Sequence, residues 1–231
     1  MHLFVSGLLI LLQTCLSTAA PPEIPASLSK WREEIAQPQI ISASFSGNGC
    51  PQGTTTTTTT TKGIRDQFTV RLAKFKVATT PPEDKTANCQ AHINLGPVRS
   101  GQQFALSDFW STGNLVLRGE GIITLSQYVT IYFSRKAKDS TTAVSRISSS
   151  SSSRPIDRDV ILHTKIPRDE LVWSDCGGGG EGLLNVNFRM AFTSMSPDDP
   201  EAYYGFYGGG GGGGGNRTVV SERLGWTWRR C

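Results

Sequence analysis

The sequence has no long apolar run beyond its first residues, and therefore no segment suited to cross a membrane as a helix. A transmembrane helix takes roughly 20 apolar residues, whereas the longest uncharged apolar stretch, residues 3–16, is shorter. The terminal residues WRRC also differ from the hydrophobic tail of a glycolipid-anchor signal. We expect no membrane partner.

A strong charge of one sign is absent too. The chain has 23 Lys and Arg against 19 Asp and Glu, a formal net charge of +4, and the basic residues are spread along it. Proteins that bind nucleic acid through its phosphates gather positive charge on one face or segment. The scattered charge indicates a solvated surface, and we expect no nucleic-acid partner.

The motifs of common hydrolases and metal sites are missing. Neither HExxH nor GxSxG occurs, and no two cysteines have the CxxC spacing of a zinc site. His92 and His163 each stand alone in an alternating segment, which is more typical of a hydrogen-bonded histidine than of a metal ligand. The sequence predicts no metal, no cofactor and no identifiable catalytic residue.

The N-terminal residues have the pattern of a secretory signal peptide. Their apolar stretch ends in small residues, with Ser17 and Ala19 suited to positions −3 and −1 of a cleavage site. We predict a signal peptide over residues 1–19, an N-terminal segment over 20–38 and a secreted domain over 39–231. The N-terminal segment is either a loose tail or a short helix with one apolar face, formed by Leu28, Trp31 and Ile35.

Four cysteines remain once the signal peptide is removed: Cys50, Cys89, Cys176 and Cys231. An even number of cysteines in an exported chain predicts two disulfides. Three pairings are possible. We predict the sequential one, Cys50 with Cys89 and Cys176 with Cys231, because it closes the two shortest loops. Each bridge would stabilise the fold by roughly 3–4 kcal/mol.

Apolar and polar residues alternate along most of the chain after Pro38, as they do in half-buried β-strands. About ten short strands follow, with turn residues between them and no long helical pattern. They include strands predicted at 102–110, at 114–125 and at 170–176, the segment ELVWSDC. This predicts an all-β fold, a single two-sheet antiparallel sandwich that is jelly-roll-like. Between Leu72 and Phe75 the alternation changes phase, which predicts a bulge or bend in a long strand.

Low-complexity runs interrupt the alternation. A short glycine run lies at 177–180, and two longer runs, at 148–153 and 208–215, predict flexible loops between strands. The eight threonines at 54–61 differ, because threonine is β-branched and favours strands. We predict that they pair with residues 66–78 as a hairpin; an O-glycosylated linker is the alternative. One sequon, NRT at Asn216, predicts an N-linked glycan and hence a glycoprotein.

Four segments resemble a known family: GCPQGT (49–54), NCQAHINL (88–95), LVWSDCGG (171–178) and WRRC (228–231). They are similar to segments of small secreted, mainly fungal proteins that carry domain of unknown function 4360. The resemblance covers roughly residues 39–231 and implies the family's fold and secretion. It implies no activity, because none is attached to the family. Where the family has an alternating strand after CPQG, this chain has the threonine run, which favours the hairpin.

Several classes of function remain open. The lack of a catalytic constellation favours a non-catalytic, monomeric module that binds an extracellular carbohydrate or protein at a cell wall or other surface. A hydrolase acting on polysaccharide would need two carboxylates, and the acid pairs Asp157/Asp159 and Asp198/Asp199 are candidates, although acids in loops are common. A protease inhibitor with a disulfide-braced loop is a third class.

The C-terminal segment LGWTWRRC bears on this choice. On a strand, Leu224, Trp226 and Trp228 point to the same side. Exposed coplanar tryptophans would form a platform for sugar rings, whereas buried ones would belong to the core. We predict that both are buried, with Trp173 near them beside the C-terminal disulfide. The alternation is that of a half-buried strand, and the resembling family commonly has an aliphatic residue in place of Trp226.

Overall fold

The computed structural model describes residues 40–60, 67–96, 100–119, 121–149, 155–177, 182–194, 201–205 and 219–231. The predicted signal peptide and the N-terminal segment at 20–38 lie outside the described residues. Among the residues described, no helix is long and apolar enough to cross a membrane.

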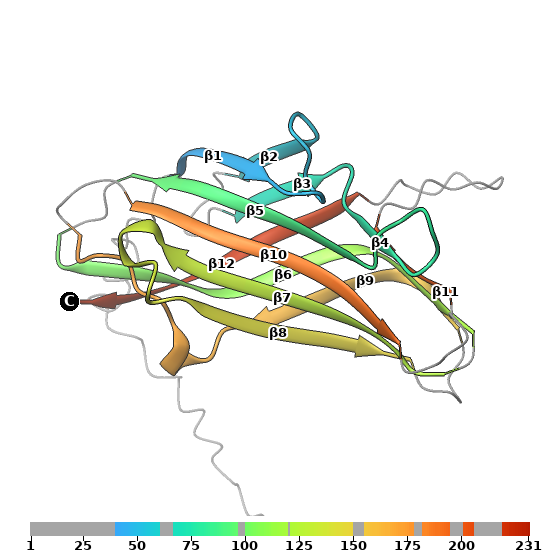
Figure 1. The fold of residues 1–231 in the computed structure, drawn as a ribbon. Helices are drawn as coiled ribbons and strands as arrows, with labels where there is room; N and C mark the ends of the chain where they lie inside the picture. The colour runs from blue at the N-terminus through green and yellow to red at the C-terminus, as the bar shows by residue number, and fades with distance from the viewer. Residues whose placement is uncertain are drawn as a thin grey trace, which may run out of the picture. The chain divides into compact units, whose positions relative to one another are not determined.

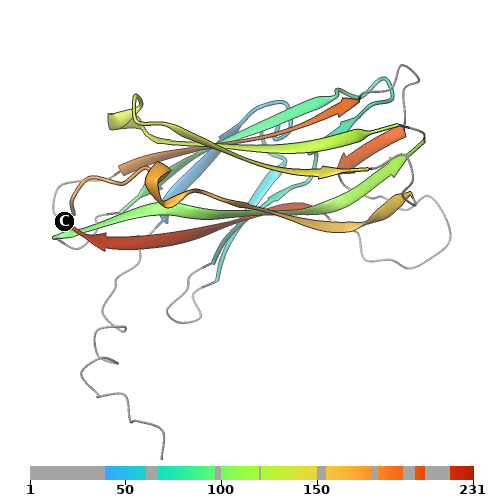
Figure 2. The same ribbon diagram turned by 90° about the horizontal axis from the view of Figure 1, so that it is seen from below.

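The described strands form two antiparallel sheets that lie as two layers (Figures 1 and 2). Sheet A has five strands, in the order β1 (Ile40–Ser46), β5 (Thr86–Leu95), β10 (Gly182–Ser194), β7 (Ile123–Phe133) and β8 (Thr141–Ser148). Sheet B has the path β2 (Thr55–Thr60), β3 (Gln67–Leu72), β12 (Val220–Arg230), β6 (Gln102–Arg118), β11 (Glu201–Gly205) and β4 (Lys76–Ala78), with β9 (Ile156–Lys165) paired to β6. Two 3₁₀ turns follow β7 and β9: η1 (Ser134–Lys136) and η2 (Arg168–Glu170). The predicted all-β sandwich is confirmed.

The core lies between the sheets and consists of the side chains that strand alternation turns inward. In β5 every second residue is buried: Ala87, Cys89, Ala91, Ile93 and Leu95. Aromatic rings join the layers, since Phe188 of sheet A lies 4.8 Å from Phe75 and 5.3 Å from Phe109 between ring centroids. Burial of this apolar surface, at roughly 25 cal/mol per Å², is the main force holding the sheets together.

Strand β6 is continuous where the sequence predicted separate strands on either side of Gly113. It pairs with β12 and then β11 along one edge, and with β9 along the other. A Cβ at Gly113 would lie 2.7 Å from Cζ of the buried Tyr204 ring. The glycine therefore lets Tyr204 cross β6, and it does not end the strand.

The change of phase after Leu72 is a break between two strands, so the predicted bulge within one long strand is wrong. β3 ends at Leu72 and pairs with β12, whereas β4 begins at Lys76 and pairs with β11. A turn closed by Phe75 N donating to Leu72 O separates the two strands.

The predicted strand ELVWSDC is also absent from the described sheets. Residues 171–177 instead lie beside the beginning of β6 without forming a strand. Ser174 N donates to Phe104 O at 2.9 Å, and Gly177 N donates to Gln102 O at 2.8 Å. These bonds are too few to make a strand, but they fix the position of Trp173.

The threonine run is a strand. β2 pairs antiparallel with β3 along its whole length, from Thr55 opposite Leu72 to Thr60 opposite Gln67. This confirms the hairpin over the linker. In the turn before β2, Gly49 N donates to Asn88 O at 2.9 Å, and a Cβ on Gly49 would lie 2.4 Å from Cδ2 of Phe75. Only glycine allows the chain to come this close to the Phe75 ring.

Amide exchange should report the β2–β3 pairing residue by residue. In an edge strand, alternate N–H groups bond to the neighbouring strand and the others face solvent. We therefore expect alternating protection over residues 55–60. Replacing Thr57 and Thr58 together with proline should lower the free energy of unfolding by roughly 1–3 kcal/mol, because one of any two neighbours donates to β3. Uniformly fast exchange and full tolerance of the prolines would contradict the pairing.

Two disulfides join distant parts of the chain, Cys50 to Cys89 and Cys176 to Cys231, which is the sequential pairing. The first bridge is buried and fixes the turn before β2 to β5 of sheet A. The second is exposed and joins the segment beside β6 to the residue that follows β12. Each bridge therefore fixes a segment that the hydrogen bonds between strands hold only in part.

Candidate functional site

His92 and His163 lie on different sheets, and each is held by a polar neighbour. In β5, His92 Nδ1 lies 2.6 Å from Asn185 Oδ1, and Asn185 Nδ2 donates to Ser134 Oγ at 2.8 Å. In β9, His163 Nε2 lies 2.8 Å from Asp108 Oδ1. Across the part of the chain that the structure describes, no group of three or more His, Cys, Asp or Glu could hold a metal ion.

The acid pair Asp157/Asp159 lies on the exposed edge strand β9 and is held by neighbours on β6. Asp157 Oδ2 lies 2.5 Å from Arg118 Nη2, and Asp159 Oδ1 accepts a hydrogen bond from Asn114 Nδ2 at 3.3 Å. Neither carboxylate lines the cleft beside Trp173 or the groove formed by residues 44–55. The other pair, Asp198/Asp199, and the sequon Asn216 lie outside the described residues.

Trp226 and Trp228 are half-buried, so the prediction that both are buried is wrong in degree. They point toward the core and pack against Phe104, with ring centroids 5.7 and 5.4 Å away. Phe104 and Phe133, 5.6 Å apart, already fill the interior at this position and leave the indoles at its rim. The two tryptophans contribute to the core and do not form an exposed sugar platform.

Trp110, which the sequence did not single out, lies on the outer face of sheet B with both ring faces covered. His163 of β9 stacks against it with centroids 4.8 Å apart, and Arg223 Cζ of β12 lies 4.2 Å from its centroid. Because β9 and β12 flank β6 on opposite edges, these neighbours cover opposite faces of the indole. Trp110 has no free ring face for a ligand.

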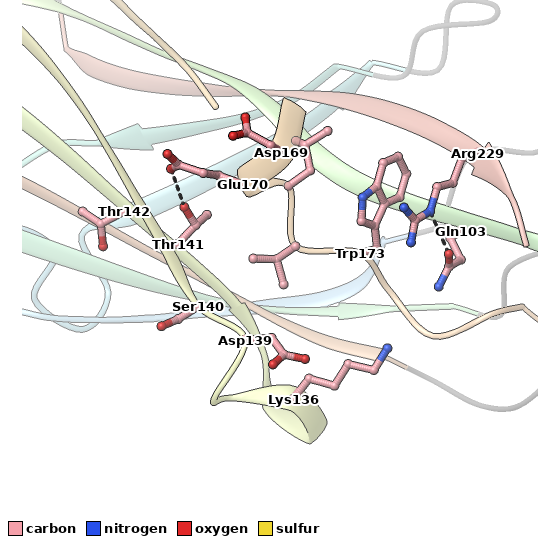
Figure 3. A pocket seen from close by; sticks show the side chains of 12 residues that line it. Gln103, Lys136, Asp139, Ser140, Thr141, Thr142, Asp169, Glu170, Trp173 and Arg229 are labelled. Atoms are coloured by element: carbon pink, nitrogen blue, oxygen red, sulfur yellow. Dashed lines mark hydrogen bonds between the residues drawn. The ribbon is translucent and has the colours of Figure 1, made fainter. Parts of the chain in front are cut away.

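A cleft of about 640 Å³ opens between the β7–β8 connection and the segment after β9 (Figure 3). One wall contains Lys136 and residues 139–142, and the other contains residues 169–173. Trp173 is its aromatic side chain. It packs against Arg229, whose Cζ lies 4.0 Å from the ring centroid and whose Nε donates to Gln103 Oε1 at 2.9 Å.

The rest of the cleft is charged. Glu170 Oε2 accepts a hydrogen bond from the Thr141 hydroxyl at 3.1 Å, and Lys136 Nζ lies 2.8 Å from Asp175 Oδ1. Three carboxylates that the sequence did not bring together line this cleft, from Asp139, Asp169 and Glu170. All three residues are exposed, whereas the general acid of a glycosidase is typically a carboxyl held in an apolar pocket.

Sheet A carries almost no charge, unlike the cleft and sheet B. Its five strands contain no Asp, Glu or Lys, and their two cationic residues are Arg146 and Arg189. The strands of sheet B carry Lys and Arg together with five acids: Asp108, Asp157, Asp159, Glu201 and Glu222. Charged residues make up 18% of the whole chain. Their scarcity in sheet A shows that folding brings the strands without acids together in one layer.

We call the solvent side of sheet A the acid-free face. Strand alternation places on it mainly amide, hydroxyl and aromatic side chains: Ser42, Ser44, Ser46, Asn88, Gln90, His92, Asn94, Tyr128, Thr130, Tyr132, Thr142, Asn185, Asn187 and Arg189. Amides and hydroxyls can both donate and accept hydrogen bonds. The acid-free face is therefore mainly polar and neutral, and the charge that its strands carry is that of Arg146 and Arg189.

Contacts between strands hold the side chains of the acid-free face in place. Gln90 Nε2 donates to Tyr132 Oη at 3.0 Å, and the Arg189 guanidinium carbon lies 4.3 Å from the Tyr128 ring centroid. Beside them, Asn187 Oδ1 is buried without a hydrogen-bond partner among the described residues. An unpaired buried polar atom costs about 1–3 kcal/mol.

A family model described as Domain of unknown function (DUF4360) matches residues 36–231. The chain belongs to this family. The resemblance noted in the sequence is thus confirmed. Most of the DUF4360 match lies on the two sheets and their disulfides, and the acid-free face is built entirely within it.

The DUF4360 chain is similar to an uncharacterized secreted protein of Arthroderma benhamiae, with 29% identity over 160 residues. The match covers 67% of this chain and 59% of the relative, so the chain spans only part of the relative's length. The two disulfides and this secreted relative support an extracellular protein.

Two solved structures are similar to this chain at low identity. One is described as the structural basis for the promiscuous specificity of carbohydrate-binding modules from the β-sandwich superfamily. It has 14% identity and a TM-score of 0.27, and the match covers 70% of this chain and 54% of the solved chain. The other is TmCBM61 in complex with β-1,4-galactotriose, with 8% identity, a TM-score of 0.25, and coverage of 83% and 90%. Both TM-scores are too low to indicate a ligand for this protein.

Proposed function

We propose that this protein is a non-catalytic secreted module that binds a neutral polysaccharide across the acid-free face. The observation that carries this proposal is the absence of Asp, Glu and Lys from all five described strands of sheet A. Amides and hydroxyls on this face match the hydroxyl groups of a sugar chain, which also donate and accept hydrogen bonds. Tyr128 and Tyr132 add aromatic surface for the apolar side of a sugar ring.

The cost of removing water from charged side chains favours the acid-free face as the site for a neutral ligand. A charged side chain that loses its water under an uncharged ligand gains no counter-charge in return, and the effective penalty is several kcal/mol per ion. Neutral polar groups lose less and recover it through hydrogen bonds to the ligand. A neutral polymer is therefore favoured on sheet A over sheet B, where Asp108, Arg223 and other ions would have to be covered.

A hydrolase is the second candidate, because the cleft brings Asp139, Asp169 and Glu170 together beside Trp173. Two carboxylates across a sugar chain are sufficient for glycoside hydrolysis. The two candidates predict different sites, the acid-free face for binding and the cleft for hydrolysis. One assay can therefore separate them.

The test introduces one carboxylate at the centre of each sheet's outer face. Thr130 of β7 lies on the acid-free face and Thr112 of β6 on sheet B, and both are half-buried. We expect Thr130→Glu to weaken binding to a neutral insoluble polysaccharide at least about tenfold, because one uncompensated carboxylate costs more than 1.4 kcal/mol. Thr112→Glu should change the affinity less than about twofold, because the ligand does not cover it.

Binding is measured as depletion of the soluble protein by insoluble β-1,3-glucan, cellulose and chitin. Soluble polygalacturonate serves as an anionic competitor, and released reducing sugar is assayed in the same tubes. Binding to at least one neutral polymer, without sugar release, is the expected result. Equal binding by both glutamate variants would contradict the proposed face. Sugar release that Glu170→Gln abolishes would establish the hydrolase instead.

A further inference from the structure

Strand β2 is an open edge that lacks the usual protection against pairing with another chain. Among the described residues β2 pairs with β3 alone, in unbroken register, and it contains neither charge nor proline. Natural edge strands are commonly protected by charged side chains, proline, bulges or a covering segment. β2 has none of these features among its described residues.

The other described edges show that protection. β8 and β9 meet across the two sheets, with Ser145 Oγ 2.7 Å from Thr164 Oγ1, and β9 also carries Asp157 and Arg158. β4 has Lys76, and β1 has an irregular register between Ile40 and Ser42. The threonine strand is the exception, and its side chains must supply whatever covers it.

The hydroxyls of β2 differ in availability. The Thr54 hydroxyl, just before the strand, donates to Pro51 O at 2.6 Å, and Thr55 Oγ1 is buried. Thr56, Thr57 and Thr58 are exposed, and within the described residues their hydroxyls have no hydrogen-bond partner. Because alternate residues of a strand point to opposite faces, these three hydroxyls project on both sides of the edge.

We infer that Thr56, Thr57 and Thr58 are acceptors for O-linked sugars, which cover the open edge of sheet B in the secreted protein. In the transfer, Thr Oγ attacks the anomeric carbon of a sugar activated as a glycosyl phosphate. The bond from that carbon to the phosphate oxygen breaks, the phosphate leaves with the electron pair, and the hydroxyl proton passes to a base of the transferase. A second strand would have to approach within about 4.8 Å of β2, and sugars on both sides of the edge prevent this.

Mass spectrometry of the full-length protein secreted from a yeast host tests the inference. The peptide containing residues 54–61 should carry hexoses in whole-number steps, and fragmentation should place them on Thr56, Thr57 or Thr58. The triple variant Thr56→Val/Thr57→Val/Thr58→Val should lose them while keeping the strand, because valine has the same branched shape without the hydroxyl. The matched control Thr86→Val/Thr193→Val removes two exposed strand threonines elsewhere and should leave the sugar mass unchanged.

A second measurement tests whether the unmodified β2 edge pairs with other molecules of the protein. Protein made in a bacterial host, which lacks the modification, should form oligomers in sedimentation velocity at concentrations where the yeast product is monomeric. Thr57→Lys should return the bacterial product to monomer, because a charged side chain protects an edge strand. An unmodified 54–61 peptide from yeast, sugars confined to other residues, or a bacterial product that stays monomeric would each overturn the inference. None of these outcomes depends on whether the acid-free face binds polysaccharide.

Discussion

Replacing Glu222 with glutamine is expected to raise the free energy of unfolding by about 3 kcal/mol at pH 7, and by much less at pH 4.5. Glu222 lies on β12, points into the core and is 3% exposed. Its Oε1 has no hydrogen-bond partner among the described residues. Burial raises the pKa of this carboxyl from 4.5 to about 8.

The direction of the pH effect follows from proton binding. Between pH 4.5 and about 8 the folded protein keeps the Glu222 proton, whereas the unfolded chain has lost it. The unfolded state binds fewer protons in this window, so the free energy of unfolding falls as the pH rises, by roughly 1.4 kcal/mol per pH unit. This part of the stability is fully present below about pH 4.5 and is lost progressively up to about pH 8.

The neighbours of Glu222 offer no compensating charge. Ser111 of β6 and Val70 of β3 are its partners across the strands. Tyr204 of β11 is the titratable group whose charge would interact with it, and burial holds the pKa of that phenol above its usual range. In the described part of the chain, no cation is paired with the carboxylate. Ionised Glu222 would therefore be an uncompensated buried charge, which the fold avoids by keeping the proton.

Urea unfolding at pH 4.5, 6 and 7 measures the effect. The difference between Glu222→Gln and the wild-type protein should increase with pH, because glutamine does not titrate. The control Glu201→Gln changes a glutamate on β11 whose side chain is 59% exposed, and whose contact with Arg118 at 3.7 Å is worth less than about 1 kcal/mol. Parallel curves for wild type and Glu222→Gln at all three values would show that Glu222 is ionised in the folded protein.

Replacing Phe104 with alanine should lower the free energy of unfolding by roughly 3–5 kcal/mol, more than the loss of either neighbouring tryptophan. Phe104 is 2% exposed and contacts three rings, those of Phe133, Trp226 and Trp228. Its truncation leaves a cavity and removes aromatic contacts worth about 0.5–1.5 kcal/mol each. It also removes the surface on which both indoles rest.

The comparison with Trp228→Ala makes this prediction specific. Trp228 is the larger side chain but is half-buried, so its removal takes away less buried surface and leaves no closed cavity. We expect it to cost roughly half as much as Phe104→Ala in urea unfolding followed by circular dichroism. A larger loss for Trp228→Ala than for Phe104→Ala would show that Trp228, and not Phe104, is the core residue at this end of sheet B.

Features that depend on short-range pattern were predictable from the sequence. The inward side of β5 follows from its alternation of apolar and polar residues. The β2–β3 hairpin follows from the strand preference of threonine beside a segment with a clear strand pattern. The predictions failed where a distant residue decides the local structure. Gly113 reads as a strand end until Tyr204 crosses over it, and ELVWSDC alternates like a strand although it makes only a few bonds to β6.

The candidate sites could not be predicted in the same way. Asp139 and Trp173 line opposite walls of one cleft although they are far apart in the sequence. Trp110 is covered by Arg223 and His163, which come from two other strands. Nothing in their local sequence marks these contacts. Spacing along the chain does not report them, because each depends on which strands lie next to one another.

The sequence by itself determined the strand pattern, the family and the set of cysteines, because alternation, short motifs and residue counts are properties of the chain alone. Only the tertiary structure decided that β1, β5, β7, β8 and β10, the source of the acid-free face, form one sheet. It alone also placed Glu222 in the core. The physical reason is that hydrogen bonds between strands join residues far apart in the chain, and the apolar side of each strand must meet the other sheet.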